Sequence, residues 1–129
     1  MKITSNDGLL FVEMTLEFRG QRSRVQRLAL HTGASQSVIS LDAVEELGIY
    51  GGRGDDIVIL QGIGGIERAL RKKIGAVELG TFKKHDMLMD FALFDRRLKI
   101  NGLVGLDILS AGQFVIDLHA MELYQRTSL

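Results

Sequence analysis

The segment Leu28-Ala29-Leu30-His31-Thr32-Gly33-Ala34-Ser35 decides which fold we expect for this chain. Its first three residues are apolar and end a stretch that is typical of a strand. A loop of small and hydroxyl-bearing residues follows without a break, beginning at His31. The segment therefore predicts a buried strand that leads directly into a short loop containing glycine.

The residues before this segment predict a β-hairpin. Apolar residues at positions 12, 14, 16 and 18 alternate with polar ones, which is the period of a strand with one buried face. Arg19-Gly20-Gln21 is typical of a tight turn, and residues 22–30 are expected to form the return strand. We interpret the basic residues of this hairpin as solvent-exposed surface, with a docking patch as the alternative; they are Arg19, Arg22, Arg24 and Arg27.

Short strands separated by turn residues are expected along the rest of the chain, at residues 38–39, 57–60, 70–79, 83–94, 114–119 and 121–124. Short helices are expected at residues 41–47 and 106–111. In the first helix Ser40 is the expected N-cap, Asp42 lies in the first turn and Gly48 is the C-cap. Many short strands with closely spaced turns predict an all-β, barrel-like domain with one or two short helices.

Two further histidines and a methionine pair have simple interpretations. We expect His85 on an exposed turn and His119 at the last hairpin turn, both solvated. Met87 and Met89 are expected to pack in the sheet together with Phe91, rather than to bind a cofactor.

Composition limits the classes of function. The chain has 129 residues, sixteen basic and sixteen acidic, so its formal net charge is zero. This balance argues against nucleic acid or an anionic membrane as partner. The absence of cysteine excludes disulfides and thiolate metal sites. No apolar run is long enough to span a membrane, and the first residues lack the apolar core of a signal peptide, so we expect a cytoplasmic location.

Three segments occur in the order found in retropepsins, the single-domain aspartic proteases of retroviral type. Residues 28–35 are similar to the family's hydrophobic strand followed by Asp-Thr-Gly-Ala-Ser, except that His31 stands at the position of the catalytic aspartate. Gly62-Ile63-Gly64-Gly65 resembles the tip of the flap that closes over substrate. Residues 103–109, Leu-Val-Gly-Leu-Asp-Ile-Leu, resemble the motif that supports the active-site loop.

The resemblance implies a small closed all-β barrel that forms one domain over residues 1–129. It also implies a homodimer, because each chain supplies one loop and the reaction needs two carboxylates that share a proton. The implied substrate is an extended peptide or protein segment, and neither a cofactor nor a metal is expected. The implied site residues are His31, Thr32 and Gly33 at the catalytic position, and Ala34, Ser35, Gly62, Ile63, Gly64 and Gly65 along the substrate.

Individual roles also follow from the resemblance. Thr32 would lock the two loops of the dimer together through its hydroxyl and backbone, and Gly33 would let the substrate backbone approach. The flap glycines would permit opening and closure. Asp107 follows the supporting motif, and we interpret it as a structural hydrogen-bonding residue.

His31 leaves three hypotheses open. The site is catalytically inactive, because neutral imidazoles cannot hold a proton between two anions and charged ones repel each other. Alternatively, one neutral and one protonated imidazole act as base and acid. As a third hypothesis, the two imidazoles bind zinc, although two ligands are too few without carboxylate support. An inactive site fits either a natural pseudoprotease or an active enzyme changed at one residue, since residues 32–35 match the family throughout.

The sequence is therefore compatible with two classes of function. The first is a peptidase that cleaves extended peptides. The second is a peptide-binding or dimerisation module that keeps the groove and the dimer but has lost cleavage. Residue 31 separates the two classes, because it is the position where the sequence departs from the catalytic motif.

Overall fold

The protein is described here by a computed structural model that covers residues 1–50, 56–62 and 65–126. Its strands are β1 (Thr4–Asn6), β2 (Leu9–Phe18), β3 (Gln21–Leu30), β4 (Val38–Ser40), β5 (Asp56–Gly62), β6 (Gly65–Leu79), β7 (Phe82–Ala92), β8 (Gly102–Val104), β9 (Phe114–Asp117) and β10 (Glu122–Gln125). Its short helices are the 3₁₀ helices η1 (Leu41–Leu47) and η2 (Arg96–Leu98) and the α-helix α1 (Leu106–Leu109).

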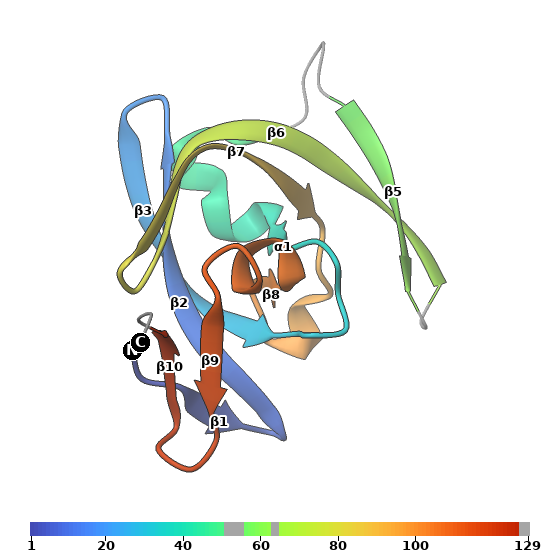
Figure 1. Cartoon of the computed structure of the whole chain (residues 1–129). Coiled ribbons are helices and arrows are strands. Elements are labelled where there is room, and N and C mark those ends of the chain that lie inside the picture. The colour runs from blue at the N-terminus through green and yellow to red at the C-terminus, as the bar shows by residue number, and fades with distance from the viewer. Residues whose placement is uncertain (51–55, 63–64, 127–129) are drawn as a thin grey trace.

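Eight strands form one sheet that closes on itself. The order is β1-β2-β3-β8-β4-β7-β6-β5, and a further pairing of β2 with β6 closes the ring. β1 and β5 therefore lie outside the closed part, each paired to a single neighbour at the margin of the ring. Figure 1 shows the hairpin formed by β5 and β6 extending away from the body of the molecule. The predicted all-β, barrel-like fold with few short helices is confirmed.

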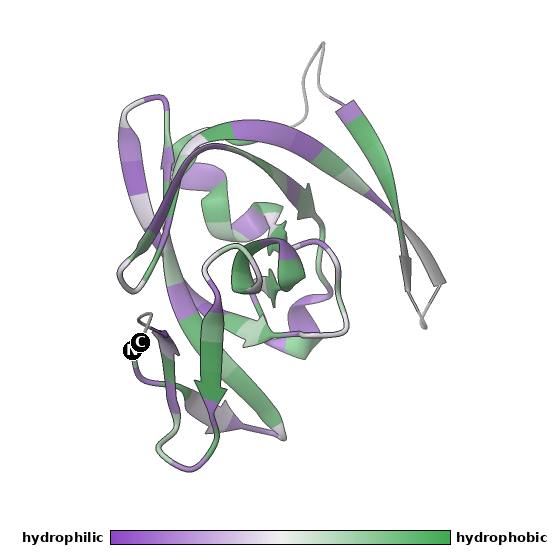
Figure 2. Cartoon of the chain, in the orientation of Figure 1, coloured by the Kyte–Doolittle hydropathy of each residue, from purple (hydrophilic) through white to green (hydrophobic). Residues whose placement is uncertain are grey.

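The core is built from the inward faces of the alternating strands. Met14 and Leu16 of β2 are buried, as the period-two pattern predicts. Met87, Met89 and Phe91 of β7 are buried on one face of their strand, so their predicted packing role is confirmed. Figure 2 shows hydrophobic and hydrophilic segments alternating along these strands, with the α1 helix largely hydrophobic.

A β-bulge interrupts β3 just before the decisive segment. Val12 pairs with Leu28 and Met14 with Val25, so two residues of β3 oppose one residue of β2. Arg27, one of the two, has a φ of 58°. Its Nε donates to the carbonyl oxygen of Lys99 at 2.7 Å, and its guanidinium lies 4.4 Å from the ring centroid of Phe11. The bulge thus attaches the loop before β8 to the strand that leads into residues 31–35.

The first residues of the chain pair with its last strand. The Leu123 N–H donates to the Met1 carbonyl oxygen at 2.8 Å, and the Ile3 N–H donates to the Met121 carbonyl oxygen at 2.9 Å. Lys2 forms a bridge opposite Glu122. Residues 1–3, β10 and β9 therefore lie side by side in that order (Figure 1). Ile3 and Leu123 are both buried, so this terminal sheet covers part of the core.

Several local predictions need correction. The segment at residues 41–47 is a 3₁₀ helix, and Ser40 stands at its N-cap without a side-chain capping hydrogen bond. The three-residue spacing of its apolar side chains fits the 3₁₀ period of 3.0 better than the α period of 3.6. Gly48 does end this helix, with a φ of 73°. His85 is exposed but lies within β7 opposite Ala76, because the strand continues through it to Ala92.

Two element boundaries also differ. The strand expected at residues 70–79 is the second part of a longer strand that begins at Gly65. The helix expected at residues 106–111 is α-helical only over Leu106–Leu109 and continues as a turn. None of the helices in the described part of the chain is long and apolar enough to cross a membrane.

Candidate active site

The candidate site is the loop between β3 and β4, which begins at His31. The His31 N–H donates to the Val104 carbonyl oxygen at 2.9 Å, which continues the parallel pairing of β3 with β8. The Ala34 N–H donates back to the His31 carbonyl oxygen at 3.2 Å and closes a turn. His31, Thr32, Gly33, Ala34 and Ser35 therefore form one compact turn at the end of a buried strand, as the sequence predicts.

Residues 105–107 hold this turn through backbone hydrogen bonds and close backbone packing. The Leu106 N–H donates to the Ala34 carbonyl oxygen at 2.8 Å, and the Asp107 N–H donates to the Ser35 carbonyl oxygen at 3.1 Å. A Cβ atom on Gly105 would lie 2.7 Å from the Ala34 carbonyl oxygen and 2.9 Å from backbone atoms of Gln36. Glycine at position 105 therefore allows the two backbones to approach this closely.

Side-chain hydrogen bonds between Ser37 and Asp107, which we call the Ser37–Asp107 clamp, also attach the loop to the segment at residues 105–108. The Ser37 hydroxyl donates to Asp107 Oδ1 at 2.7 Å and accepts from the Gly105 N–H at 2.9 Å. The same carboxylate oxygen accepts from the Ser37 N–H at 3.0 Å and the Ile108 N–H at 2.9 Å. The structural role predicted for Asp107 is thus confirmed, and Ser37 is its buried partner.

The imidazole of His31 is exposed and folds over its own loop. A Cβ atom on Gly33 would lie 3.0 Å from His31 Cε1 and 3.3 Å from Nδ1, so the ring rests against the glycine. Neither ring nitrogen has a hydrogen-bond or ion-pair partner among the described residues. Thr32 and Ser35 are also exposed. The polar groups at the start of the loop therefore face outward and are free to meet a ligand or a second chain.

The flap predicted around residues 62–65 is a β-hairpin. β5 and β6 pair over their full length, from Asp56 opposite Arg71 to Gly62 opposite Gly65. Ile63 and Gly64 lie outside the described residues, so the predicted tip itself is described only through the backbone pairing of its two flanking glycines.

An ion pair anchors the base of this hairpin. Arg71 Nε donates to Asp90 Oδ1 at 2.8 Å and Nη2 donates to Oδ2 at 3.1 Å, a two-pronged contact between β6 and β7. The Asp90 side chain is 1% exposed. Hydrogen bonding to this carboxylate raises the pKa of Arg71 above its ordinary value. A small apolar cluster, separate from the main core, lies between the hairpin and the barrel; it consists of Val38, Ala69 and Ala92 with Val58, Leu60 and Phe94 packed against it.

Comparison with known proteins agrees with this geometry. A family model described as aspartyl protease matches residues 14–108, which include the loop, the hairpin and the supporting segment. The chain belongs to the aspartyl protease family. The crystal structure of a retropepsin-like aspartic protease from Rickettsia conorii is similar to it, with a TM-score of 0.64 and 19% sequence identity over 90% of this chain and 82% of that one. A search of curated proteins gave no match.

In this aspartyl protease chain, sequence reasoning located the loop but not the contacts that fix it. The clamp between Ser37 and Asp107 joins residues seventy positions apart, and the anchor between Arg71 and Asp90 joins two strands. Sequence reasoning predicted a structural hydrogen-bonding role for Asp107, but nothing in the sequence pattern identified Ser37 as its partner.

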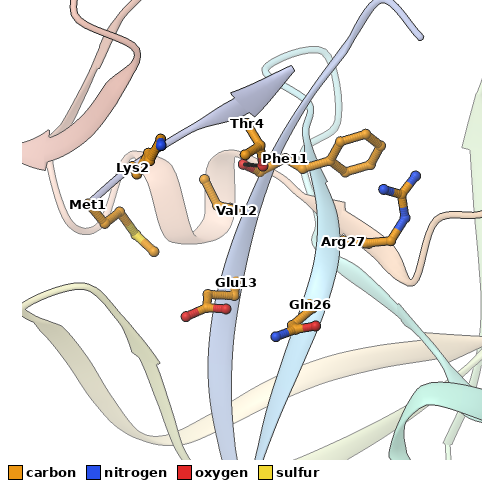
Figure 3. Close-up of a pocket in the computed structure, with 8 residues that line it drawn as sticks. All are labelled: Met1, Lys2, Thr4, Phe11, Val12, Glu13, Gln26 and Arg27. Atoms are coloured by element: carbon orange, nitrogen blue, oxygen red, sulfur yellow. Dashed lines mark hydrogen bonds between the residues drawn. The ribbon is translucent and has the colours of Figure 1, made fainter. Parts of the chain in front are cut away.

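A surface pocket of about 400 Å³ lies elsewhere on this aspartyl protease chain. Figure 3 shows its lining on the N-terminal segment, β2 and β3, with the guanidinium of Arg27 beside the ring of Phe11; the lining residues are Met1, Lys2, Thr4, Phe11, Val12, Glu13, Gln26 and Arg27. It includes no residue of the His31 loop or of the β5–β6 hairpin. Among the described residues, no group of three or more His, Asp or Glu side chains is arranged to hold a metal ion.

Proposed function

We propose that this chain is a retropepsin-like peptidase domain that binds extended peptides as a homodimer, and that His31 blocks hydrolysis. The observation that supports this most directly is the contrast between the fixed backbone of the loop and the exposed side chain of His31. Its backbone is held by residues 104–107 and by the Ser37–Asp107 clamp, while the side chain at its first position is an exposed imidazole without a partner in the described part of the chain.

Homodimer formation follows from the number of loops. The described residues supply one such loop, and the aspartic protease reaction needs two catalytic groups that face each other. Thr32 and Ser35 are exposed beside His31, in a position to contact the loop of a second copy. The catalytic role of His31, Thr32 and Gly33 and the substrate contacts of Ala34, Ser35 and residues 62–65 belong to this proposal.

Peptide binding is supported by the apolar residues where the hairpin meets the barrel. The separate apolar cluster around Val38, Ala69 and Ala92 lies between β4, β6 and β7, with Val58 and Leu60 of β5 packed against it. A peptide running beneath the hairpin would meet apolar walls on one side and backbone groups of the loop on the other. We therefore propose that the bound peptides carry apolar side chains.

The block by His31 has a chemical basis. In an aspartic protease one carboxylate activates water as a general base while its protonated partner polarises the scissile carbonyl group. Two neutral imidazoles offer no anion to share a proton, and two protonated ones offer no base. The scaffold around the loop is intact, and the loop begins with His31 where the family has its catalytic aspartate. This combination favours peptide binding without cleavage.

The decisive experiment compares the chain with its His31→Asp variant on a peptide library, at acidic and neutral pH. We expect cleavage by His31→Asp and none by the chain as it stands. His31→Asn, which has no ionisable group, is the matched control and should also be inactive. Cleavage by the histidine form would overturn the proposed block, and an inactive, folded and dimeric His31→Asp variant would overturn the proposed peptidase scaffold.

Binding is measured separately. Fluorescence anisotropy with labelled peptides should detect binding by the histidine form, and mass spectrometry should find those peptides intact afterwards. Binding that persists when residues 62–65 are deleted and β5 and β6 are rejoined by a two-residue turn would contradict the proposed groove beneath the hairpin.

A further inference from the structure

The loop at residues 31–37 presents side-chain hydrogen-bond donors and carries no acid. Its sequence, His-Thr-Gly-Ala-Ser-Gln-Ser, contains neither aspartate nor glutamate. The side chains of His31, Thr32, Ser35 and Gln36 are exposed and make no hydrogen bond or ion pair with the described residues. Imidazole, hydroxyl and amide groups each carry at least one N–H or O–H donor. The surface of the loop can therefore donate several hydrogen bonds to one ligand.

Backbone N–H groups add to this set of donors. The Ala34 N–H closes the turn onto His31, whereas the N–H groups of Thr32, Gly33 and Ser35 have no acceptor among the described residues. These three residues are exposed. An exposed N–H group without an acceptor carries a partial positive charge and favours an anionic partner.

The acidic side chain that contacts the loop does not occupy these donors. Asp107 Oδ1 accepts from Ser37 and from the Ile108 N–H. Asp107 Oδ2 is buried and has no partner among the described residues. Asp107 therefore leaves the donors around His31 available to an external anion.

Histidine at position 31 changes what the loop can attract. An ionised aspartate only accepts hydrogen bonds, and it repels another carboxylate. An imidazole has at least one N–H donor in either protonation state and never carries a negative charge. A carboxylate is therefore favoured at His31, at the position where the aspartate of the family would oppose it.

We infer that the His31 loop binds the carboxylate of an extended peptide, and that this carboxylate is the peptide's own C-terminus. The inference rests on the proposed function and specifies its ligand. In the proposed homodimer two copies of His31 face one axis, so each imidazole donates one N–H to one of the two carboxylate oxygens. A peptide end suits this position because hydrolysis of a peptide bond leaves a C-terminal carboxylate where the scissile carbonyl group lay.

Apolar side chains beside the loop favour a peptide over a small free anion. Val38 follows Ser37 directly and belongs to the apolar cluster where the hairpin meets the barrel. Phe94 packs against the same cluster, and its neighbour Leu93 is 71% exposed. An apolar peptide gains contacts with these side chains as well as with the donors of the loop, whereas acetate or phosphate gains only the donors.

Two matched sets of short, labelled, apolar peptides test the inference. One set has a free C-terminal carboxylate, and the other is identical except for a C-terminal amide. Fluorescence anisotropy should show that the chain binds the carboxylate set more tightly by about tenfold or more. Equal affinities would overturn the inference and leave the proposed peptide binding intact. A folded chain that binds neither set would contradict the proposed function, and the inference with it.

A pair of variants assigns the preference to the loop. His31→Leu removes the imidazole donor and keeps an exposed side chain of similar size, so the ratio of the two affinities should fall to about threefold or less. His85→Leu, at an exposed histidine of β7, is the control and should keep the full ratio. The ratio compares two peptides on one variant, so a partial loss of folding does not change it. An unchanged ratio in His31→Leu would overturn the inference.

A third peptide set identifies the source of the carboxylate. These peptides have a C-terminal amide and an internal glutamate, and they should bind no more tightly than the plain amide set. If they bind as tightly as the set with a free C-terminus, or more tightly, the assignment to the C-terminus is wrong.

Nuclear magnetic resonance locates the bound carboxylate. The Cε1–H resonance of His31, assigned by its loss in His31→Leu, should shift more with the free-carboxylate peptide than with the amide. A tenfold preference for the carboxylate set without this difference would place the carboxylate elsewhere and overturn the inference.

Discussion

At the scale of single residues, the loop that begins at His31 is held by backbone contacts in which particular side chains are required. Gly105 is needed because a Cβ atom there would lie only 2.7 Å from the Ala34 carbonyl oxygen. Ser37 is needed because its hydroxyl donates to Asp107 and accepts from the buried Gly105 N–H. The His31 side chain rests against Gly33 but makes no hydrogen bond or ion pair with the described residues. The loop geometry and the chemistry at its first position are therefore separable.

Gly105→Ala should destabilise the protein by about 2–3 kcal/mol, because the new methyl group would overlap the carbonyl oxygen of Ala34. Gly33→Ala is the control: its methyl group would meet only the exposed ring of His31, so its free energy of unfolding should change by less than about 1 kcal/mol. Urea denaturation of the two variants measures the difference. Equal stabilities would contradict a tight fit at position 105.

Ser37→Ala should cost about 1–3 kcal/mol of unfolding free energy, since it leaves the buried Gly105 N–H without an acceptor and removes one donor from Asp107. Ser35→Ala, at an exposed hydroxyl of the same loop, should change stability by less than about 0.5 kcal/mol. Thermal unfolding followed by circular dichroism distinguishes the two. A Ser37→Ala variant as stable as Ser35→Ala would mean that the clamp does not hold the loop.

At the scale of elements, the β5–β6 hairpin is joined to the barrel through β6, and the Arg71–Asp90 pair lies at that junction. Its carboxylate is buried whereas its guanidinium remains partly exposed. Two parallel hydrogen bonds fix the angle between the partners as well as their distance. The pair therefore defines where the hairpin leaves the sheet.

Arg71→Leu should destabilise the protein by about 3 kcal/mol, because it leaves the Asp90 carboxylate buried without a counter-charge. Arg24→Leu removes an exposed contact with Glu13 at 3.8 Å and should cost less than about 1 kcal/mol. Denaturant unfolding at neutral pH compares the two variants. If both cost the same, the buried carboxylate must have another source of stabilisation.

Sequence reasoning succeeded at this scale where a pattern is local. The alternation in β2 and β7 and the turn at Gly20 could be predicted, because side-chain direction and turn chemistry depend on neighbouring residues. The pairing of Met1 and Ile3 with β10, and the clamp between Ser37 and Asp107, could not. These contacts join distant parts of the chain, and Lys2, Ile3 and Ser37 carry no local signal of their partners.

At the scale of the whole molecule, the aspartyl protease family assignment and the closed sheet agree. The homodimer that we propose would bring two copies of His31 toward one axis. In that arrangement, charge at residue 31 would act on assembly as well as on chemistry.

A fixed positive charge at residue 31 should weaken the proposed dimer, because two like charges near one axis repel each other. His31→Lys introduces that charge, whereas His31→Gln keeps a polar side chain without charge and should dimerise more tightly than His31→Lys. Sedimentation equilibrium of both variants makes the comparison. An equal extent of dimerisation in both variants would contradict the proposed position of residue 31 near the axis.

The parallel pairing of β3 with β8 also governs the order in which the protein can fold. Leu30 lies beside Val104, so the strand that ends at His31 gains its neighbour only after most of the chain is present. Contacts between residues so far apart in sequence form slowly, on the millisecond-to-second scale typical of such topologies. The β2–β3 hairpin can form early from local contacts, whereas the loop at its end stays unsupported until Gly105 and Asp107 arrive. A newly made chain can therefore form its β2–β3 hairpin before the loop of its candidate active site is held in place.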